Sequence, residues 1–290
     1  MKRDALLQVE DLRLYFRTTQ GVVQAVDGVD LDVGYRQALA VLGESGCGKS
    51  SLVKAILRLL PRNVHTYSGQ ISLNGDDLMS MDEERFRREV RWSGMSLVAQ
   101  AALNSLNPVL KVGEQIIEPL TTHRSMSREE AGDRAREMLR LVGVPIDLFS
   151  RYAFELSGGM RQRVAGAIAL SCQPSLLIAD EPTTSLDATV QAQYLRLLQE
   201  LQEEFDFGLI FVTHDLGIVA RLCDRVAVMY AGRIVEAGPT RNIFNRAHHP
   251  YASALLDSIP RLEVRGQRLP AIGGQPPVLI DLPPGCSFAP

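Results

Sequence analysis

The stretch that most restricts how this chain can fold is GESGCGKS, residues 43–50. It follows the short apolar run QALAVL and precedes KSSLVKAILRLL, in which apolar residues recur every three or four positions. The first pattern is typical of a buried strand, and the second predicts an amphipathic helix that ends before Pro61. The sequence therefore predicts a strand, a glycine-rich loop and a helix in direct succession, which is a building unit of α/β folds.

The loop carries the residue types that bind phosphate groups. Its spacing fits G-x-x-x-x-G-K-[ST], with Lys49 and Ser50 in the last two positions. Glycines let backbone N–H groups approach an anion, and the N-terminus of the following helix adds partial positive charge. We expect Lys49 to reach the β- and γ-phosphates of a nucleotide and Ser50 to bind Mg²⁺. The expected phosphate-binding residues are Gly43, Glu44, Ser45, Gly46, Cys47, Gly48, Lys49, Ser50 and Ser51.

The charge balance and the hydropathy pattern limit the possible partners. The 290 residues are 46% hydrophobic and carry a formal net charge of −3, which does not suggest a nucleic-acid-binding surface. The mixed charges of DEERFRREVR, residues 82–91, are typical of a solvated helix face. No stretch approaches the roughly 18 apolar residues of a membrane span, and the N-terminus lacks the apolar core of a secretion signal. We expect a soluble protein that serves a membrane only through partners.

The four cysteines, Cys47, Cys172, Cys223 and Cys286, are scattered along the chain and form no C-x-x-C pair. This spacing predicts neither a zinc site nor a disulfide framework. We expect Cys172 and Cys223 to be inert buried residues.

The predicted pattern of strands and helices changes along the chain. Residues 6–16, 22–33 and 37–43 are predicted to form strands, and so is GQISLNGDDL, with an Asn-Gly turn. From about residue 105 to 156 helical patterns take over. After residue 157 helices and strands alternate, which predicts a mostly parallel sheet covered by helices. The proline- and glycine-rich tail from about residue 241 is expected to be an irregular extension.

Two acidic residues end another predicted strand. In LLIADEPTTSLD, residues 176–187, a short apolar run leads to Asp180 and Glu181. Ligands collect at the carboxyl ends of parallel strands. We expect Asp180 to hold Mg²⁺ through water, and Glu181 to orient or polarise a water molecule for attack. A solvated acidic turn is the alternative, and the phosphate-binding loop elsewhere in the chain weighs against it.

A second helix start is also suited to an anion. LSGGMRQRVAGAIAL, residues 156–170, places Ser157, Gly158 and Gly159 at the beginning of a predicted helix. One nucleotide needs only one phosphate-binding loop, so this second helix start is surplus in a monomer. An ordinary helix cap is the alternative.

Together these motifs point to a known family. From about residue 6 to 240 the chain resembles the ATP-binding subunit of ABC transporters in the order and spacing of its motifs. The matching motifs are the loop at 43–50, Gln100, LSGGMRQR at 156–163, ADEP at 179–182, SLD at 185–187 and VTHD with His214. The resemblance implies an α/β fold: a P-loop NTPase (RecA-like) core of mostly parallel sheet, with an antiparallel β subdomain, a helical insert and a short irregular C-terminal extension.

The resemblance also implies how single residues act. Two subunits would pack head to tail, so that residues 157–159 of one close over the ATP held by the phosphate-binding loop of the other. Phe16 would stack on the adenine, and Asp187 would lie at the dimer seam. His214 would contact the γ-phosphate and Glu181. Taken by themselves, Phe16 could be a core aromatic residue and His214 a structural one.

Gln100 would join Mg²⁺ and the attacking water to the helical insert, and so to a membrane partner. The implied catalytic residues are Lys49, Gln100, Glu181 and His214, and the implied Mg²⁺ ligands are Ser50, Gln100 and Asp180. Three local departures from the family pattern are Arg36-Gln37, Ala99 and the segment AALNSLNP. They change loop packing and remove no catalytic group.

Within the family, the sequence resembles the oligopeptide, dipeptide and nickel importer branch, most clearly in HHPYASALLDSIPRL after residue 247. This implies a nucleotide-binding domain at 1–240, with a helical subdomain at about 101–160, and a C-terminal extension at 241–290. The implied partners are a second ATPase subunit, two transmembrane permease subunits and, indirectly, an extracytoplasmic solute-binding protein. The chain would hydrolyse ATP at the cytoplasmic face of the membrane to power uptake of peptides or nickel.

In this branch a motif such as LPPGC often begins a cysteine cluster that holds an iron–sulfur centre. Such a centre needs four ligands, normally thiolates, and this part of the sequence has only Cys286. We therefore assign ATP and Mg²⁺ as cofactors and no iron–sulfur cluster.

Two other classes of function stay open from the sequence. One is a soluble ABC ATPase without a transporter, acting in DNA repair or translation, although such proteins usually carry two cassettes or a coiled-coil or zinc insertion. The other is a regulatory nucleotide-binding module without turnover, against which Glu181 and His214 argue. The solute, the choice between a homodimer and a sister subunit, and continuation of the chain past Pro290 also stay open.

Overall fold

The computed structural model describes residues 5–100, 105–184, 186–258, 277–280, 282 and 285–289. The chain divides into two compact units. The first unit comprises Met1–Met79 and Phe211–Pro290, and the second comprises Ser80–Ile210. Each unit is described by itself.

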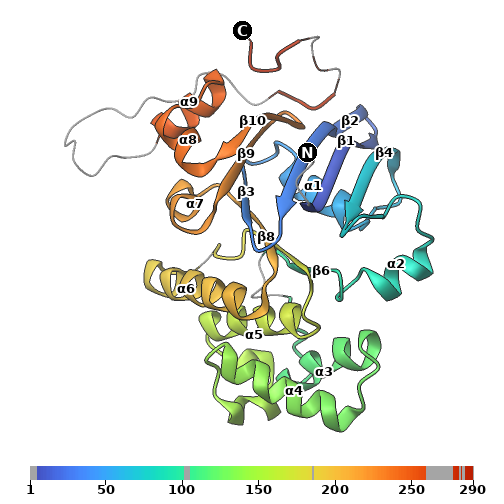
Figure 1. Ribbon diagram of the computed structural model, residues 1–290, viewed down its shortest axis with the longest axis vertical. Coiled ribbons are helices and arrows are strands. Elements are labelled where there is room, and N and C mark those ends of the chain that lie inside the picture. Colours follow the sequence, from blue (N-terminus) through green and yellow to red (C-terminus); the bar gives the residue numbers. More distant parts are fainter. Residues whose placement is uncertain are drawn as a thin grey trace, which may run out of the picture. The chain divides into compact units, whose positions relative to one another are not determined.

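The first unit contains an antiparallel sheet of strand order β2-β1-β4-β5 (Figure 1). Its strands are β1 (Ala5–Thr18), β2 (Gly21–Gly34), β4 (Val64–Leu73) and β5 (Asp76–Asp77). The turn between β4 and β5 is Asn74-Gly75, where both residues have positive φ, 53° and 87°. Asparagine and glycine tolerate this conformation best, so the turn expected from the sequence is confirmed.

The same unit contains strands in the order β10-β9-β3-β8, where β8 begins in the second unit. These are β3 (Ala38–Leu42), β8 (Gly208–Thr213), β9 (Arg225–Tyr230) and β10 (Arg233–Pro239). β3 and β9 run parallel, and β10 pairs antiparallel with β9. Every residue of β3 and β8 is buried, as expected for strands covered on both faces. The strand β10 was not predicted from the sequence.

Helix α1 (Lys49–Ile56) follows β3 through the glycine-rich loop and packs against β1 and β2. It ends earlier than the apolar pattern predicted, because Arg58 adopts a left-handed conformation with φ 51°. The Arg58 guanidinium donates to the carbonyl of Leu78, 2.9 Å away, and this tertiary contact has no signature in the local sequence. Helix α7 (Leu216–Leu222) lies between β8 and β9 in the chain and packs against β3.

The C-terminal extension is not irregular throughout, which corrects the sequence-based expectation. It contains two short helices, α8 (Thr240–Asn245) and α9 (Pro250–Asp257), drawn in orange in Figure 1. The start of α9 has a clear local cause, since Pro250 occupies its first turn and His249 Nδ1 accepts a hydrogen bond from the Tyr251 N–H. The proline-rich composition of the tail favoured an irregular structure, so the start of α9 was not predicted from His249 and Pro250.

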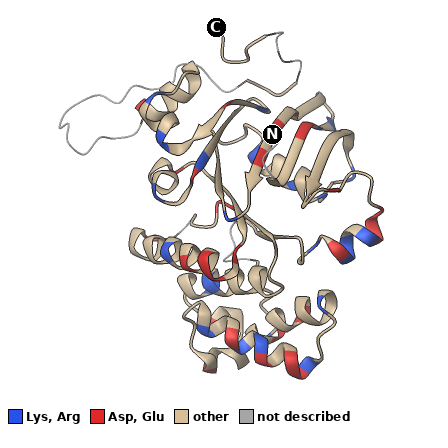
Figure 2. Ribbon diagram, viewed as in Figure 1, with Lys and Arg blue, Asp and Glu red and all other residues tan. Residues whose placement is uncertain are grey.

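The second unit holds the paired strands β6 (Met95–Val98) and β7 (Leu176–Asp180), which run parallel. Its helices are α2 (Glu83–Glu89), α3 (Val112–His123), α4 (Arg128–Leu141), α5 (Gly158–Leu170) and α6 (Ala188–Phe205), with 3₁₀ turns at Ile146–Ser150 and Ala153–Glu155. Helices α3 and α4 pack together in the helical region expected from the sequence. Both charge signs mix on α2 and α4 (Figure 2), as the sequence pattern of α2 indicated.

Within the described ranges, no helix has the length and apolar character needed to cross a membrane. Cys172 and Cys223 are buried, which confirms their predicted placement, and Cys47 is buried as well. Cys286 is exposed.

Candidate functional site

The glycine-rich loop of the first unit forms a compact turn between β3 and α1. Ser45 and Gly46 are exposed at its tip, whereas Gly43, Cys47 and Lys49 are buried. The loop therefore presents its tip to solvent and anchors both of its ends in the protein.

Two of the glycines are required by the space around the loop. A Cβ atom at Gly43 would lie 2.2 Å from the carbonyl oxygen of Met229, and one at Gly48 would lie 2.2 Å from the carbonyl oxygen of Ala25. Gly48 also has φ 113°, a conformation that residues with a side chain rarely adopt. Strands β9 and β2 thus leave room only for a bare backbone at these two positions.

Lys49 is 6% exposed, and its ammonium group lies inside the loop. Its Nζ donates to the carbonyl oxygens of Gly43, at 2.7 Å, and Glu44, at 2.8 Å. Burial raises the pKa of the neighbouring Cys47 thiol in spite of the positive charge of Lys49. Cys47 is therefore an uncharged packing residue, and Lys49 supplies the positive charge of the loop.

The N-terminus of α1 completes this candidate anion site. Gly48 forms no side-chain cap, and the first turn of α1 contains no acidic residue. The first N–H groups of a helix carry partial positive charge and lack partners within the helix. Ser50 and Ser51, also in the first turn, are half-buried. The arrangement is suited to a multiply charged anion such as a polyphosphate.

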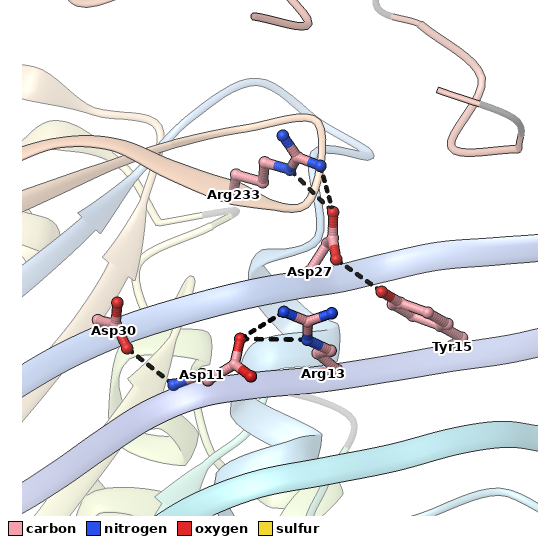
Figure 3. A network of polar contacts seen from close by, with 6 residues as sticks. All are labelled: Asp11, Arg13, Tyr15, Asp27, Asp30 and Arg233. Carbon is pink, nitrogen blue, oxygen red and sulfur yellow. Dashed lines mark hydrogen bonds and ion pairs between the residues drawn. The ribbon is translucent and has the colours of Figure 1, made fainter. Parts of the chain in front are cut away.

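The turn after β9 supports the loop from the side. The N–H of Gly232 donates to the carbonyl of Cys47, at 2.8 Å, and the carbonyl of Gly232 accepts from the N–H of Asp27, at 2.8 Å. Next to it, Asp27 accepts hydrogen bonds from the Tyr15 hydroxyl, at 2.6 Å, and from Arg233 Nε, at 2.8 Å (Figure 3). Side chains of β1, β2 and β10 therefore hold the turn in place.

The charge state of Asp27 follows from these contacts. Burial opposes a charge on its carboxyl group, but the hydrogen bonds from Tyr15 and Arg233 outweigh burial, and the pKa of Asp27 lies below its ordinary value. The group is therefore a carboxylate at neutral pH and forms a charge-assisted contact with Arg233.

The acidic strand end lies in the second unit. Asp180 is the last residue of β7 and is 7% exposed, and Glu181 follows with φ 46°. Gln100 Nε2 donates to Glu181 Oε2 at 3.0 Å, and the Thr184 hydroxyl reaches the same oxygen at 3.3 Å. The structure thus brings together Gln100 and Glu181, two of the predicted catalytic residues. Thr184 was not predicted from the sequence, where its one local signal is its position three residues after Glu181.

The oxygen donors of this region fit a magnesium ion. Mg²⁺ prefers oxygen ligands and commonly binds one or two carboxylates together with phosphate oxygens. Asp180 offers a buried carboxylate, and because the amide nitrogen of Gln100 points to Glu181, its oxygen is the group suited to a cation. In the described part of the chain, no group of three or more His, Cys, Asp or Glu residues could hold a metal ion.

The second anion-suited helix start belongs to α5, also in the second unit. Ser157 and Gly158 are exposed, and the Ser157 side chain caps α5 by accepting from the Met160 N–H at 3.3 Å. A Cβ atom at Gly159 would lie 2.7 Å from Val190 in the first turn of α6. Asp187 caps α6 by accepting from the N–H groups of Thr189 and Val190. The starts of α5 and α6 therefore meet, although Ser185 of the SLD motif lies outside the described residues.

The other predicted residues lie in the first unit. His214 is exposed and directly follows β8, and half-buried Phe16 lies in β1, opposite Val23 of β2. Tyr251 of α9 was not predicted as a site residue, yet its hydroxyl accepts a hydrogen bond from the N–H of Glu44 at 3.0 Å. A contact between residues 207 positions apart has no local signature. Cys286 lies near the same helix, with Sγ 3.6 Å from His249 Nε2.

A glycine-rich loop between a buried strand and a helix, with a buried lysine inside it, defines a P-loop nucleotide-binding protein of the α/β class. Comparison with known families places the chain within this class. A family model described as "ABC transporter" matches residues 26–184, and one described as "Oligopeptide/dipeptide transporter, C-terminal region" matches residues 235–290. The chain belongs to the ABC transporter family of ATP-binding proteins, as the sequence motifs predicted.

Individual relatives agree with this assignment. The oligopeptide transport ATP-binding protein OppD of Bacillus subtilis (strain 168) is 47% identical over 288 residues, which are 98% of this chain and 80% of the relative. The dipeptide transport ATP-binding protein DppD of the same organism is 44% identical over 289 residues, covering 99% and 86%. A dimeric structure of the ATP-binding cassette MJ0796 bound to ADP and Pi matches with a TM-score of 0.71 and 26% identity, over 81% of this chain and 99% of that one. The predicted P-loop NTPase fold is thereby confirmed.

Proposed function

We propose that this chain is the ATP-hydrolysing subunit of an ABC importer that takes up peptides. The observation that carries this proposal is the match over nearly the whole chain to peptide transport ATP-binding proteins, including the C-terminal region at residues 235–290. That C-terminal match favours an importer of this branch over an ABC ATPase of DNA repair or translation. The buried lysine of the P-loop and the hydrogen-bonded Gln100–Glu181 pair favour turnover over a purely regulatory role.

In the proposed reaction, the P-loop backbone and Lys49 bind the β- and γ-phosphates of ATP. Phe16 stacks on the adenine. Ser50, Asp180 and Gln100 offer oxygen ligands to Mg²⁺, which neutralises phosphate charge when it is bound. Glu181 orients the attacking water, a role supported by the hydrogen bond that fixes its Oε2 on Gln100. His214 contacts the γ-phosphate.

We further propose that two ATPase subunits act as a head-to-tail pair, either two copies of this chain or this chain and a sister. The exposed start of α5 at Ser157 and Gly158 would then close on ATP bound to the other subunit. The start of α6, capped by Asp187, would lie at the same seam. In this pair the start of α5 contacts a nucleotide, whereas in a single chain it would have no nucleotide to contact.

The proposed pair works on the cytoplasmic face of the membrane with two transmembrane permease subunits. An extracytoplasmic solute-binding protein would deliver the solute, a peptide or a related solute such as nickel. The part of the chain that faces the permeases is the helical region that begins near Gln100, so that Gln100 couples the permeases to the attacking water.

The test uses Glu181→Gln, which keeps the size of the side chain and the contact with Gln100 but removes the carboxylate. The variant should bind Mg-ATP and lose most turnover, roughly 100-fold or more. Its mass by light scattering should double when ATP is added, since ATP is then held and not hydrolysed. Glu200→Gln, an exposed change on α6, serves as the matched control and should keep wild-type turnover.

Three outcomes would speak against different parts of the proposal. Failure of the wild-type chain to bind ATP would remove the ATPase assignment altogether. Turnover unchanged in Glu181→Gln would remove the role of Glu181. A monomer that binds ATP would rule out pairing of two copies of this chain alone, and the same measurement with added candidate sister subunits would then decide between the two forms of the pair.

A further inference from the structure

The peptide bond between Gly43 and Glu44, in the P-loop, is held at both ends. Its carbonyl oxygen, on Gly43, accepts a hydrogen bond from Lys49 Nζ at 2.7 Å. Its N–H, on Glu44, donates to the hydroxyl of Tyr251 at 3.0 Å. One peptide plane is therefore bound by the phosphate-binding lysine on one side and by a residue of helix α9 on the other. Rotation of this plane would break both contacts together.

Tyr251 is itself held firmly. Its side chain is fully buried, and its ring lies against Tyr230, with centroids 4.4 Å apart, and edge-on to Phe288, at 5.4 Å. The start of α9 is fixed to β10, because the Glu236 carboxylate accepts from the N–H groups of His248 and His249. A side chain locked by packing can hold its partner in one position at little further entropic cost.

The chemical nature of the tyrosine suits its place beside a phosphate-binding loop. Burial raises the pKa of the Tyr251 hydroxyl, so the group stays neutral at physiological pH. A neutral hydroxyl can accept the Glu44 N–H and adds no negative charge next to the bound phosphates. A carboxylate in the same place would accept the same hydrogen bond but would repel the nucleotide.

We propose that Tyr251 is a positioning residue for nucleotide binding, through which the C-terminal extension fixes the Gly43–Glu44 peptide and, with it, Lys49. The inference rests on the proposed binding of ATP by the P-loop. It assigns to α9 (Figure 1) a direct part in the nucleotide site of the same chain. A P-loop that is already in its binding conformation spends less free energy on ordering when phosphate binds.

The test compares Tyr251→Phe with wild type by calorimetric titration with Mg-ADP and by steady-state ATP hydrolysis. The substitution removes only the hydroxyl and keeps the buried ring. The loss of one hydrogen bond of ordinary strength should weaken Mg-ADP binding roughly three- to tenfold and raise the KM for ATP similarly. The kcat should change by less than about twofold, because the hydroxyl supports the ground state and the transition state alike.

Tyr230→Phe is the matched control. Tyr230 belongs to the same aromatic cluster, and in the described part of the chain no hydrogen bond joins its hydroxyl to the P-loop. Its removal should leave the Kd for Mg-ADP within about twofold of wild type. Equal effects of the two variants would overturn the proposal, since a general loosening of the cluster would then explain both.

The melting temperature separates positioning from stability. A purely structural role of the hydroxyl would lower the melting temperature equally with and without Mg-ADP, whereas weaker binding also reduces the shift that Mg-ADP causes. The proposal requires the reduced shift in Tyr251→Phe, and an unchanged shift would overturn it. If wild type itself bound no Mg-ADP and no ATP, the proposed function would fail; if wild type bound and Tyr251→Phe bound equally well, only this inference would fail.

Discussion

The two helix starts that suit a phosphate, at α1 and at α5, are built in opposite ways. The P-loop before α1 has a buried lysine and is held by contacts from three other parts of the first unit, β2, the turn after β9 and α9. The start of α5 is exposed at Ser157 and Gly158, and its cap is a single hydrogen bond to the Ser157 side chain. The P-loop at residues 43–50 is therefore a preformed cradle for an anion, whereas the start of α5 is an open surface.

This difference teaches what each region can do in a single chain. A cradle whose backbone is fixed before the ligand arrives can bind phosphate by itself. An open helix start offers a few N–H groups and a partial charge, which is too little to hold a nucleotide exposed to water. The start of α5 can therefore contact a nucleotide only when another subunit binds that nucleotide. The proposed head-to-tail pair provides this arrangement.

The largest effect is expected from Lys49→Ala, which removes the charge from the preformed cradle. Because Lys49 would supply charge-assisted hydrogen bonds to phosphate in the proposed site, Mg-ATP binding should weaken by about 100-fold or more. Calorimetric titration measures this, with Lys54→Ala, an exposed change on the same helix, as the control that should bind normally. Binding that stays within threefold of wild type would show that the loop is not the phosphate site.

Gly158→Asp tests the open surface and should separate binding from turnover. The aspartate places a negative charge at the start of α5, so ATP binding by one chain should stay within about twofold while turnover falls roughly 10- to 100-fold. Arg128→Asp places the same residue at the equivalent first position of α4 and should leave turnover near wild type. Loss of ATP binding in Gly158→Asp would contradict the division of labour between the two helix starts.

The structure of the P-loop could be predicted from the local sequence, because it depends on residue types at fixed spacing within one short segment. A G-x-x-x-x-G-K-[ST] spacing after a buried strand fixes a loop that only glycine allows at Gly43 and Gly48, and the structure shows the crowding that demands it. The acidic strand end at Asp180 and the start of α5 were found for the same reason, since each is a short motif at the end of a regular element.

The features that were not predicted from the sequence depend on contacts between segments far apart in the chain. The hydrogen bond of Tyr251 to Glu44 spans 207 positions, and the early end of α1 at Ile56 follows from a contact between Arg58 and Leu78. Helix α9 carried a local signal, Pro250 after the capping His249, but it stood next to a proline-rich tail whose composition favoured an irregular structure. The roles of Phe16, His214 and Asp187 stay predictions.

Thr184→Val should have a moderate effect confined to the chemical step. The Thr184 hydroxyl lies 3.3 Å from the Glu181 oxygen that also meets Gln100, so its loss removes one of the contacts that orient Glu181. We expect turnover to fall about three- to tenfold with unchanged Mg-ATP binding. Steady-state kinetics beside a binding titration measures both, and Thr122→Val, an exposed change on α3, is the control. Weaker binding with normal kcat would show that Thr184 acts on the nucleotide instead.

The smallest effect is expected from Asp27→Asn. It tests whether the contacts that support the P-loop affect the stability of the fold without affecting ATP binding. Asp27 joins Tyr15 and Arg233 (Figure 3). It lies next to Gly232, whose N–H donates to the Cys47 carbonyl. An amide keeps one acceptor but loses the charge, so the free energy of unfolding should fall by about 1 kcal/mol at pH 7, with ATP binding changed less than twofold. Urea denaturation measures the difference, and Asp30→Asn, an exposed change on the same strand, should give little.

The pH dependence of that difference identifies its cause. Because the pKa of Asp27 is lowered in the folded chain, its carboxylate stabilises the fold above the pKa of the unfolded chain, about 3.9. This contribution is lost as the pH falls through the lower pKa of the folded chain. The gap in unfolding free energy between wild type and Asp27→Asn should therefore stay constant from pH 6 to 8 and shrink below about pH 4. A gap of equal size at all pH values would mean that packing, and not charge, makes Asp27 part of the support for the P-loop.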